Sequence, residues 1–200
     1  RDIAPIMARA MAGHKETNKM AGILSAWDFY DDADQAAPAV FQATYRLFAR
    51  MTFQDELGDD LSSVMLDNWY FWQERLFKMV IENDSPWFDD TSTEQIEETR
   101  YDLFLRAGRE AAMQLKAEMG KSPSKWTWGK IHTIEHVSPI RREGIGNGLL
   151  GSFKLRVACT SLTLLRYYYR FNKHFDVIVS DSNRMVADLS DPDKILAVLT

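Results

Sequence analysis

The hydrophobic periodicity of this chain changes at Gly120, and the change constrains the fold more than any other feature of the 200 residues. Before Gly120, apolar residues recur at intervals of three and four positions, which is typical of amphipathic helices. After it, short β-branched or aromatic runs alternate with clusters of Gly, Pro, Asn and Asp, which is typical of strands. This order indicates an α+β fold, with a helical region over residues 1–120 and a mostly antiparallel β-rich region over residues 121–200.

Five helices are expected in the first region. Gly13, Gly58 and Gly120 are placed to end the first, third and fifth of them, because glycine readily adopts the left-handed conformation that closes many helices. Thr91, followed three residues later by Glu94, predicts a capping box at the start of the last helix. The expected helices span residues 3–11, 15–27, 38–58, 61–79 and 91–120.

The second region is expected to form short strands joined by turns. The stretch 141–151 contains four glycines and is predicted to be a flexible loop. Its Gly-x-Gly-x-Gly run does not indicate a phosphate-binding loop, because a clear strand-to-helix unit and the Lys-Ser/Thr pair of a P-loop are both missing. The expected strands span residues 130–137, 153–157, 161–169, 174–179, 184–189 and 195–199.

Charge and composition argue against nucleic acid as a partner and against a membrane-spanning segment. Residues 1–120 carry 12 basic and 22 acidic side chains, whereas residues 121–200 carry 12 basic and 7 acidic ones. The acidic helical region argues against nucleic-acid binding, and the basic and aromatic residues of 166–173 are interpreted as a half-buried strand. No apolar run approaches about 18 residues, so no membrane-spanning segment is predicted. The one cysteine, Cys159, forms no disulfide within the chain and is interpreted as a small buried residue.

Residues 132–136 read His-x-x-Glu-His, a zinc-binding pattern of some metallopeptidases. In that chemistry His132 and His136 bind the metal from one face of a helix, and Glu135 acts as the base. The alternation of residue types here predicts a strand, on which positions four apart lie about 13 Å from each other. A zinc peptidase is therefore a distant alternative, and no metal ligand is assigned. The acidic clusters at 31–34 and 89–90 lack calcium-loop spacing and are interpreted as solvated acids beside helix ends.

Nucleophilic chemistry is not indicated by spacing either. The sequence contains no nucleophile-elbow motif, and no Ser-His-Asp triad follows from the scattered serines and histidines. The residues alone predict a soluble α+β unit without an evident active site. A non-catalytic binding or scaffold module therefore remains open as an alternative function.

Several short segments occur in an order that carries a family resemblance. They are residues 27–28 (Trp-Asp), 86–90 (Pro-Trp-Phe-Asp-Asp), 98–100 (Glu-Thr-Arg), 126–132 (Trp-x-Trp-Gly-x-x-His) and 182–193, which begin Ser-x-Arg-Met-Val-x-Asp-Leu. Together they resemble the large (β) subunit of the penicillin acylase, or penicillin amidase, family of N-terminal nucleophile hydrolases, over nearly the whole chain. Two departures are Ser180-Asp181, where the family usually has Gly-Pro, and the end at Thr200, where family members commonly continue.

The resemblance implies an internal or C-terminal fragment of a larger domain in a self-processed precursor. It implies hydrolysis of side-chain amides, either β-lactam acyl side chains or N-acyl-homoserine lactones, through an acyl-enzyme on an N-terminal serine. Because arginine has no hydroxyl, that nucleophile is expected upstream of Arg1. The implied partners are the upstream part of the large subunit, the small subunit and a small amide substrate, and the implied location is periplasmic or secreted. No cofactor is expected; the family admits calcium, but the sequence identifies no ligands for it.

The resemblance assigns no catalytic residue within this chain. Asp188 is a weak candidate for a carboxylate that orients the α-amine of the nucleophile. Arg184 and His132 are weak candidates for bracing the site or for tying strands together. A structural role is the preferred interpretation of all three residues.

Overall fold

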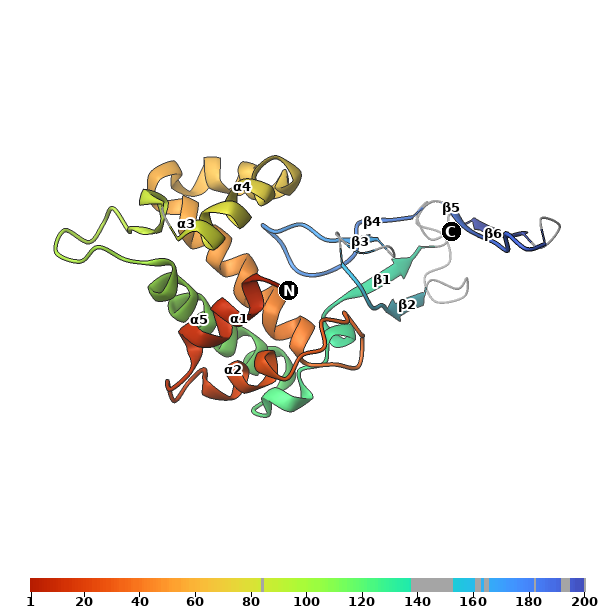
Figure 1. Cartoon of the computed structure of the whole chain (residues 1–200), viewed down its shortest axis with the longest axis horizontal. Coiled ribbons are helices and arrows are strands. Elements are labelled where there is room, and N and C mark those ends of the chain that lie inside the picture. The colour runs from red at the N-terminus through yellow and green to blue at the C-terminus, as the bar shows by residue number, and fades with distance from the viewer. Residues whose placement is uncertain are drawn as a thin grey trace.

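The computed structural model describes residues 1–83, 85–137, 153–160, 163, 166–181, 183–191 and 195–199. Figure 1 shows the helices gathered into one body, with the strands extending from it toward the C-terminus. Helices in the first part and antiparallel strands in the second part confirm the predicted α+β class.

The helical body is built around α3 and α5. Phe48 and Phe104 stack between these helices with ring centroids 3.8 Å apart. Gly108 of α5 faces Met11 of α1 so closely that no Cβ would fit without moving the methionine, so a glycine here permits the close approach of the two helices. The helices are α1 Ile3–Met11, α2 Asn18–Ser25, α3 Ala37–Asp67, α4 Trp69–Glu82 and α5 Arg100–Met119, with short 3₁₀ turns η1 Pro86–Phe88, η2 Pro123–Lys125 and η3 Trp128–Lys130.

The predicted boundary at Gly58 is a kink rather than a helix end. Gly58 has a φ of 70° and a ψ of 173°, which are not helical, but α3 resumes after it and continues to Asp67. The predicted fourth helix is therefore divided between the last turns of α3 and α4. Leu61 and Val64, two apolar residues of the predicted helix over 61–79, are both exposed, because the part of α3 beyond the kink lies at the surface.

The fifth helix begins later than the capping box at Thr91 and Glu94 predicted. Residues 91–99 stay outside the helix because side chains satisfy their backbone groups locally. The Glu98 N–H donates to the Asp89 carboxylate over 2.9 Å, and the Asp90 N–H donates to the Glu98 carboxylate over 3.0 Å. The predicted start of this helix is therefore wrong, whereas its predicted end at Gly120, which has a φ of 87°, is confirmed.

Thr99 and Asp102 form the capping box that starts α5. The Thr99 N–H and hydroxyl donate to the Asp102 carboxylate over 2.9 Å and 2.6 Å, and these bonds lower the pKa of that carboxyl. Replacing Thr99 by alanine is expected to lower the free energy of unfolding by about 1 kcal/mol. Thr91→Ala is the matched control and is expected to change it by less than about 0.5 kcal/mol in the same urea titration. Equal effects of the two changes would contradict the observed helix start.

The described strands form three antiparallel two-stranded ladders. They are β1 Thr133–His136 with β2 Phe153–Arg156, β3 Tyr167–Tyr168 with β4 Val179–Ser180, and β5 Asn183–Ala187 with β6 Ile195–Leu199. In the first ladder Thr133 lies opposite Arg156, and in the last Asn183 lies opposite Leu199. The expected strands at 161–169 and 174–179 are represented by β3 and β4, which are much shorter. The predicted glycine-rich loop at 141–151 lies outside the described residues.

The β-rich region is joined to the helical body by a shared core. Trp128, Tyr169 and Phe175 are fully buried and belong to the same hydrophobic cluster as the helix residues. The backbone N–H groups of Trp128 and Gly129 donate to the carbonyls of Gln35 and Ala33 over 2.9 Å and 2.8 Å. The two regions differ in hydrophobic period, but they bury their aromatic side chains together.

Candidate functional site

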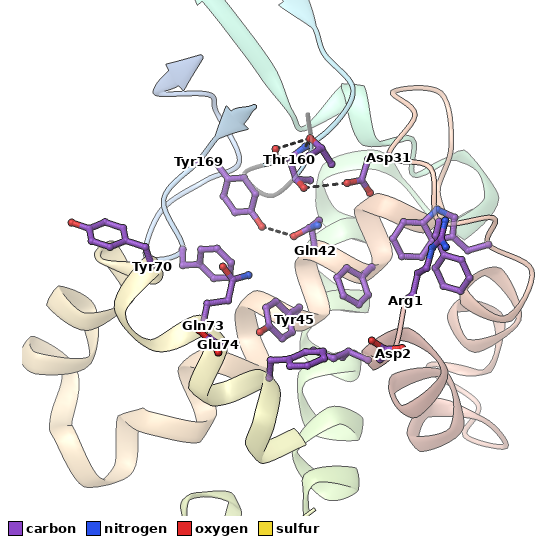
Figure 2. Close-up of a pocket in the computed structure, with 17 residues that line it drawn as sticks. Arg1, Asp2, Asp31, Gln42, Tyr45, Tyr70, Gln73, Glu74, Thr160 and Tyr169 are labelled. Carbon is purple, nitrogen blue, oxygen red and sulfur yellow. Dashed lines mark hydrogen bonds between the residues drawn. The ribbon is translucent and has the colours of Figure 1, made fainter. Parts of the chain in front are cut away.

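A cavity of about 490 Å³ lies where both regions of the chain meet. Its lining comes from the start of α1, the segment between α2 and α3, the first turns of α3, the helix α4 and residues 160–171. Figure 2 shows these side chains around the cavity. This volume lies within the usual range of small-molecule pockets, about 300 to 1,000 Å³.

Aromatic rings form the walls of the cavity. The ring centroid of Trp27 lies 5.4 Å from those of Phe29 and Phe41. Phe41 stacks on Tyr45 at 5.7 Å, because positions four apart in α3 share one helix face. Phe171 from the β-rich region meets Tyr45 edge-on at 6.2 Å. The lining is therefore mainly apolar and suits an apolar or aromatic group of a ligand.

Two polar pairs lie on the side of the cavity nearest the strands. The Tyr169 hydroxyl donates to Gln42 Oε1 over 2.7 Å, and the Thr160 hydroxyl donates to Asp31 Oδ2 over 3.1 Å (Figure 2). Burial raises the pKa of the Asp31 carboxyl, against the opposing effect of the Thr160 hydrogen bond. Burial also raises the pKa of Tyr169, so this hydroxyl stays protonated and remains a donor. The sequence predicted that Asp31 is a solvated acid. In the structure it is half-buried, because residues 159–160 pack over it.

The backbone of the cavity rim is unusual at two positions. Phe29 has a φ of 67° and Cys159 has a φ of 69°, and a positive φ is uncommon for side chains of this kind. The Cys159 N–H donates to the Asp31 carbonyl over 2.6 Å. This bond holds the Cys159 segment against the α2–α3 segment, which places Thr160 beside the Asp31 carboxylate.

The lining of the cavity is suited to recognising an apolar group. Hydroxyl groups line the cavity at Thr160, Thr163 and Tyr169, but the described lining contains no histidine, lysine or cysteine. A hydroxyl needs an adjacent base or a lowered pKa to become a nucleophile. The described cavity can bind an apolar group and offer it hydrogen bonds, and its Thr160 hydroxyl lies beside the Asp31 carboxylate rather than beside a histidine or lysine.

His132, one of the sequence candidates, lies in the core beside this cavity. Its ring is fully buried and stacks on Trp128 with centroids 4.4 Å apart. Nδ1 lies 2.7 Å from the Phe175 carbonyl oxygen; because a carbonyl only accepts, Nδ1 carries the proton. Nε2 is buried without a partner among the described residues. Burial lowers the pKa of His132 to about 4, so the ring is neutral near pH 7.

The His-x-x-Glu-His pattern of residues 132–136 lies on extended backbone, not on a helix. Residues 133–136 form β1, as the alternation predicted. The His132 ring is buried, whereas the His136 ring lies on an exposed position and stacks on Phe153 with centroids 5.0 Å apart. Within the described part of the chain, no three His, Cys, Asp or Glu side chains are grouped to hold a metal ion. This geometry does not support the zinc peptidase alternative.

Asp188 and Arg184 belong to the β5–β6 hairpin, which projects away from the helical body in Figure 1. Asp188 follows β5 and is exposed. Its carboxylate accepts hydrogen bonds from the Ser190 N–H over 2.9 Å and the Ser190 hydroxyl over 2.7 Å, and these bonds lower its pKa. The backbone of Arg184 lies opposite Val198. The catalytic assistance suggested for Asp188, Arg184 and His132 stays a prediction.

Comparison with known proteins identifies the family. The model of the penicillin amidase family matches residues 1–200. The chain belongs to the penicillin amidase family. Proteins named acyl-homoserine lactone acylase QuiP are similar to it. The protein from Pseudomonas syringae pv. tomato is 26% identical over 173 residues, which cover 84% of this chain and 21% of that protein. The protein from Pseudomonas aeruginosa is 24% identical over 192 residues, which cover 88% and 22%. The chain thus spans about a fifth of the length of these curated relatives.

This penicillin amidase family chain contains no helix, among the described residues, that is long and apolar enough to cross a bilayer.

Gly129, which lies in the motif over residues 126–132, allows two backbone segments to approach closely. A Cβ on Gly129 would lie 2.9 Å from the Ala33 Cβ and 3.1 Å from the Ala33 carbonyl oxygen. Gly129→Ala is therefore expected to lower the free energy of unfolding by about 1 to 3 kcal/mol. Gly22→Ala in α2 is the control, because a Cβ there meets nothing within 4 Å, and it is expected to raise that free energy by up to about 1 kcal/mol. Urea titrations of both variants measure the difference; stabilisation by Gly129→Ala would contradict the close approach.

Proposed function

We propose that this chain is part of an acylase that hydrolyses the amide bond of N-acylated small molecules, either N-acyl-homoserine lactones or the acyl side chains of β-lactams. The observation that carries the proposal is the penicillin amidase family match over residues 1–200. The relatives named acyl-homoserine lactone acylase support the first substrate class. The acyl group is released as a carboxylate, and the other product carries the freed amine.

The nucleophile in this proposal is the hydroxyl of an N-terminal serine elsewhere in the natural protein, with its own α-amine as the base. Attack on the amide carbonyl gives a tetrahedral oxyanion stabilised by hydrogen-bond donors, then an acyl-enzyme that water hydrolyses. Two observations support a nucleophile that lies outside this chain. The chain spans about a fifth of the length of its curated relatives, and the described lining of the cavity contains no histidine, lysine or cysteine.

We further propose that the described region packs against other parts of the same precursor, namely the upstream large subunit and the small subunit. Large apolar side chains on the last turns of α3 and on α4 support this. Leu61, Val64, Tyr70 and Phe71 are 61 to 78% exposed. Exposed apolar groups gathered on neighbouring helices commonly mark an interface. An exported or periplasmic location accompanies the proposal, and cell fractionation tests it.

Incubation of the full-length natural protein with N-hexanoyl and N-dodecanoyl homoserine lactone, and separately with benzylpenicillin, tests the activity. Mass spectrometry is expected to detect the free amine product and the matching carboxylic acid from at least one substrate. N-terminal sequencing and intact mass of each polypeptide are expected to find a chain that begins with serine. Replacing that serine by alanine is expected to abolish product formation. If none of the substrates releases an amine, the proposal is wrong.

A non-catalytic binding module of the same fold is the second candidate. The specific observation that favours it is the aromatic cavity, whose described lining is mainly apolar and contains no histidine, lysine or cysteine. Saturable binding of an N-acyl ligand by the full-length protein, without release of the amine over many hours, would establish this candidate. Turnover of the same ligand would exclude it.

A further inference from the structure

The aromatic cavity, which is the cavity of about 490 Å³ described above, has acidic residues in its lining as well as aromatic ones. Asp2, Asp31 and Glu74 line it, whereas Arg1 is the one basic residue of the described lining. Its aromatic walls come from α3, α4 and residues 27–29 and 169–171. The face of an aromatic ring and a carboxylate both attract positive charge, so this combination of groups is suited to an organic cation.

Asp31 offers a carboxylate oxygen that a ligand can reach. Its Oδ2 accepts a hydrogen bond from the Thr160 hydroxyl over 3.1 Å (Figure 2). Its Oδ1 has no hydrogen-bond partner in the described part of the chain. Because Oδ1 is unpartnered and yet is not one of the fully enclosed polar atoms of the fold, it keeps accessible surface. Asp31 lines the cavity, so this oxygen is available to a donor that enters it.

The Asp31 carboxylate lacks a closely placed positive charge. Burial raises its pKa, and the Thr160 hydrogen bond and the α-ammonium group of Arg1, which both lower the pKa, do not offset burial. Within the described residues no lysine, arginine, histidine or N-terminal nitrogen forms an ion pair with this carboxylate. A buried carboxylate is stabilised by a paired cation, and a ligand that carries an ammonium group supplies one.

The other charges of the lining leave Asp31 Oδ1 open to a ligand. Glu74 pairs with Lys78 over 3.1 Å, and both side chains are exposed. Asp2 is exposed as well. The Arg1 guanidinium lies 5.9 Å from the centroid of the Phe29 ring, which is within the usual distance for a cation above a ring. This contact shows that an aromatic wall of the cavity accepts a cation on its face.

We propose that the aromatic cavity binds an organic ammonium ion that carries an aromatic or apolar group. The ammonium donates a hydrogen bond to Asp31 Oδ1. The apolar group packs against Trp27, Phe41 and Tyr45, whose rings contact one another in series at 5.4 Å and 5.7 Å between centroids. An ammonium ion has no amide bond to hydrolyse, so this site goes beyond the acylase activity proposed above and is tested independently of it.

Three probes test the proposal on the full-length natural protein by isothermal titration calorimetry at pH 7 and constant ionic strength. Saturable binding of 2-phenylethylammonium with one site per chain is expected. The alcohol 2-phenylethanol keeps the ring without the charge, and ethylammonium keeps the charge without the ring. Each is expected to bind about tenfold more weakly or worse. Absence of saturable binding by 2-phenylethylammonium, as when another part of the precursor fills the cavity, would overturn the proposal, and so would equal affinity for 2-phenylethanol.

Variants place the binding at Asp31. Asp31→Asn keeps the size of the side chain and an oxygen for the Thr160 hydroxyl, but removes the charge. It is expected to weaken 2-phenylethylammonium about tenfold and to leave 2-phenylethanol nearly unchanged. Asp60→Asn, at an exposed position of α3 outside the cavity, is the matched control and is expected to change neither affinity. Circular dichroism checks that both variants fold, and the three probes on the unaltered protein decide the charge preference if Asp31→Asn does not. Unchanged affinity of folded Asp31→Asn, or equal weakening by Asp60→Asn, would contradict the site.

Discussion

Replacing Trp128 by alanine is expected to lower the free energy of unfolding by about 3 to 5 kcal/mol, the usual cost of deleting a fully buried large aromatic side chain. The Trp128 indole is fully buried and stacks on His132. It also meets Tyr169 and Phe175 edge-on, at 6.1 Å and 5.4 Å between centroids. Its Nε1–H donates to the Cys159 carbonyl over 3.0 Å. Deletion of the ring therefore opens a cavity at the junction of the two regions and removes the hydrogen bond to that carbonyl.

Urea titration of the full-length natural protein, followed by circular dichroism, measures this loss. Trp128→Phe keeps most of the ring packing but removes the Nε1 donor, so a loss of about 1 to 3 kcal/mol is expected. Tyr30→Ala is the matched control, because this ring is 70% exposed, and a change within about 0.5 kcal/mol is expected. A Trp128→Ala effect no larger than that of Tyr30→Ala would contradict the shared core.

The stability of this protein is expected to fall by about 3 kcal/mol between pH 6.5 and pH 4 through His132 alone. The pKa of His132 is lowered to about 4 in the fold, whereas an unfolded histidine has a pKa of about 6.5. The unfolded state therefore binds the proton more tightly than the folded state across this window. The contribution is fully present above about pH 6.5 and is lost as the pH falls through 4.

The physical cause is the surroundings of Nε2. The Nδ1 proton is already used by the Phe175 carbonyl, so a second proton would place a positive charge on a buried Nε2 without an acceptor among the described residues. The charge of Asp176 and the hydrogen bond to Phe175 favour the protonated ring, but burial outweighs them. Protonation is thus expected to be coupled to local opening of the core around Trp128.

Unfolding free energies of the wild type and of His132→Gln, measured in urea at several pH values, isolate this contribution. Carboxylates titrate in the same range in both proteins, so the difference between the two curves reports His132. The variant is expected to be less stable at pH 7 and to lose about 3 kcal/mol less than the wild type on acidification. His136→Gln, at an exposed position of β1, is the matched control. Parallel curves for the wild type and His132→Gln would contradict the buried neutral ring.

Local sequence signals predicted most element types and several of their ends. The helix over 3–11, the end of the last helix at Gly120 and a strand within 130–137 were predicted from residues close together in the chain. The structure confirms the two helix predictions and places the strand at Thr133–His136, shorter than predicted. The start of α5 was missed because Thr91 and Glu94 match a capping pattern, while bonds from Asp89 and Glu98 hold residues 91–99 outside the helix. The capping pattern of Thr91 and Glu94 is recognisable in the sequence, whereas the hydrogen bonds made by Asp89 and Glu98 match no known motif.

Periodicity and ordered motifs are properties of the chain, so the α+β order, the aromatic residues available to a core and the family could be predicted from the residues. Which polar groups meet depends on how the chain folds. Tyr169 reaches Gln42 across 127 positions, and Thr160 reaches Asp31 across 129. His132 reaches Phe175, 43 positions away, and Arg46 reaches Lys173, 127 positions away. The spacing of residues along a helix or strand determines which face each side chain lies on. Contacts between residues 43 to 129 positions apart form only when the helices and strands pack around a shared core.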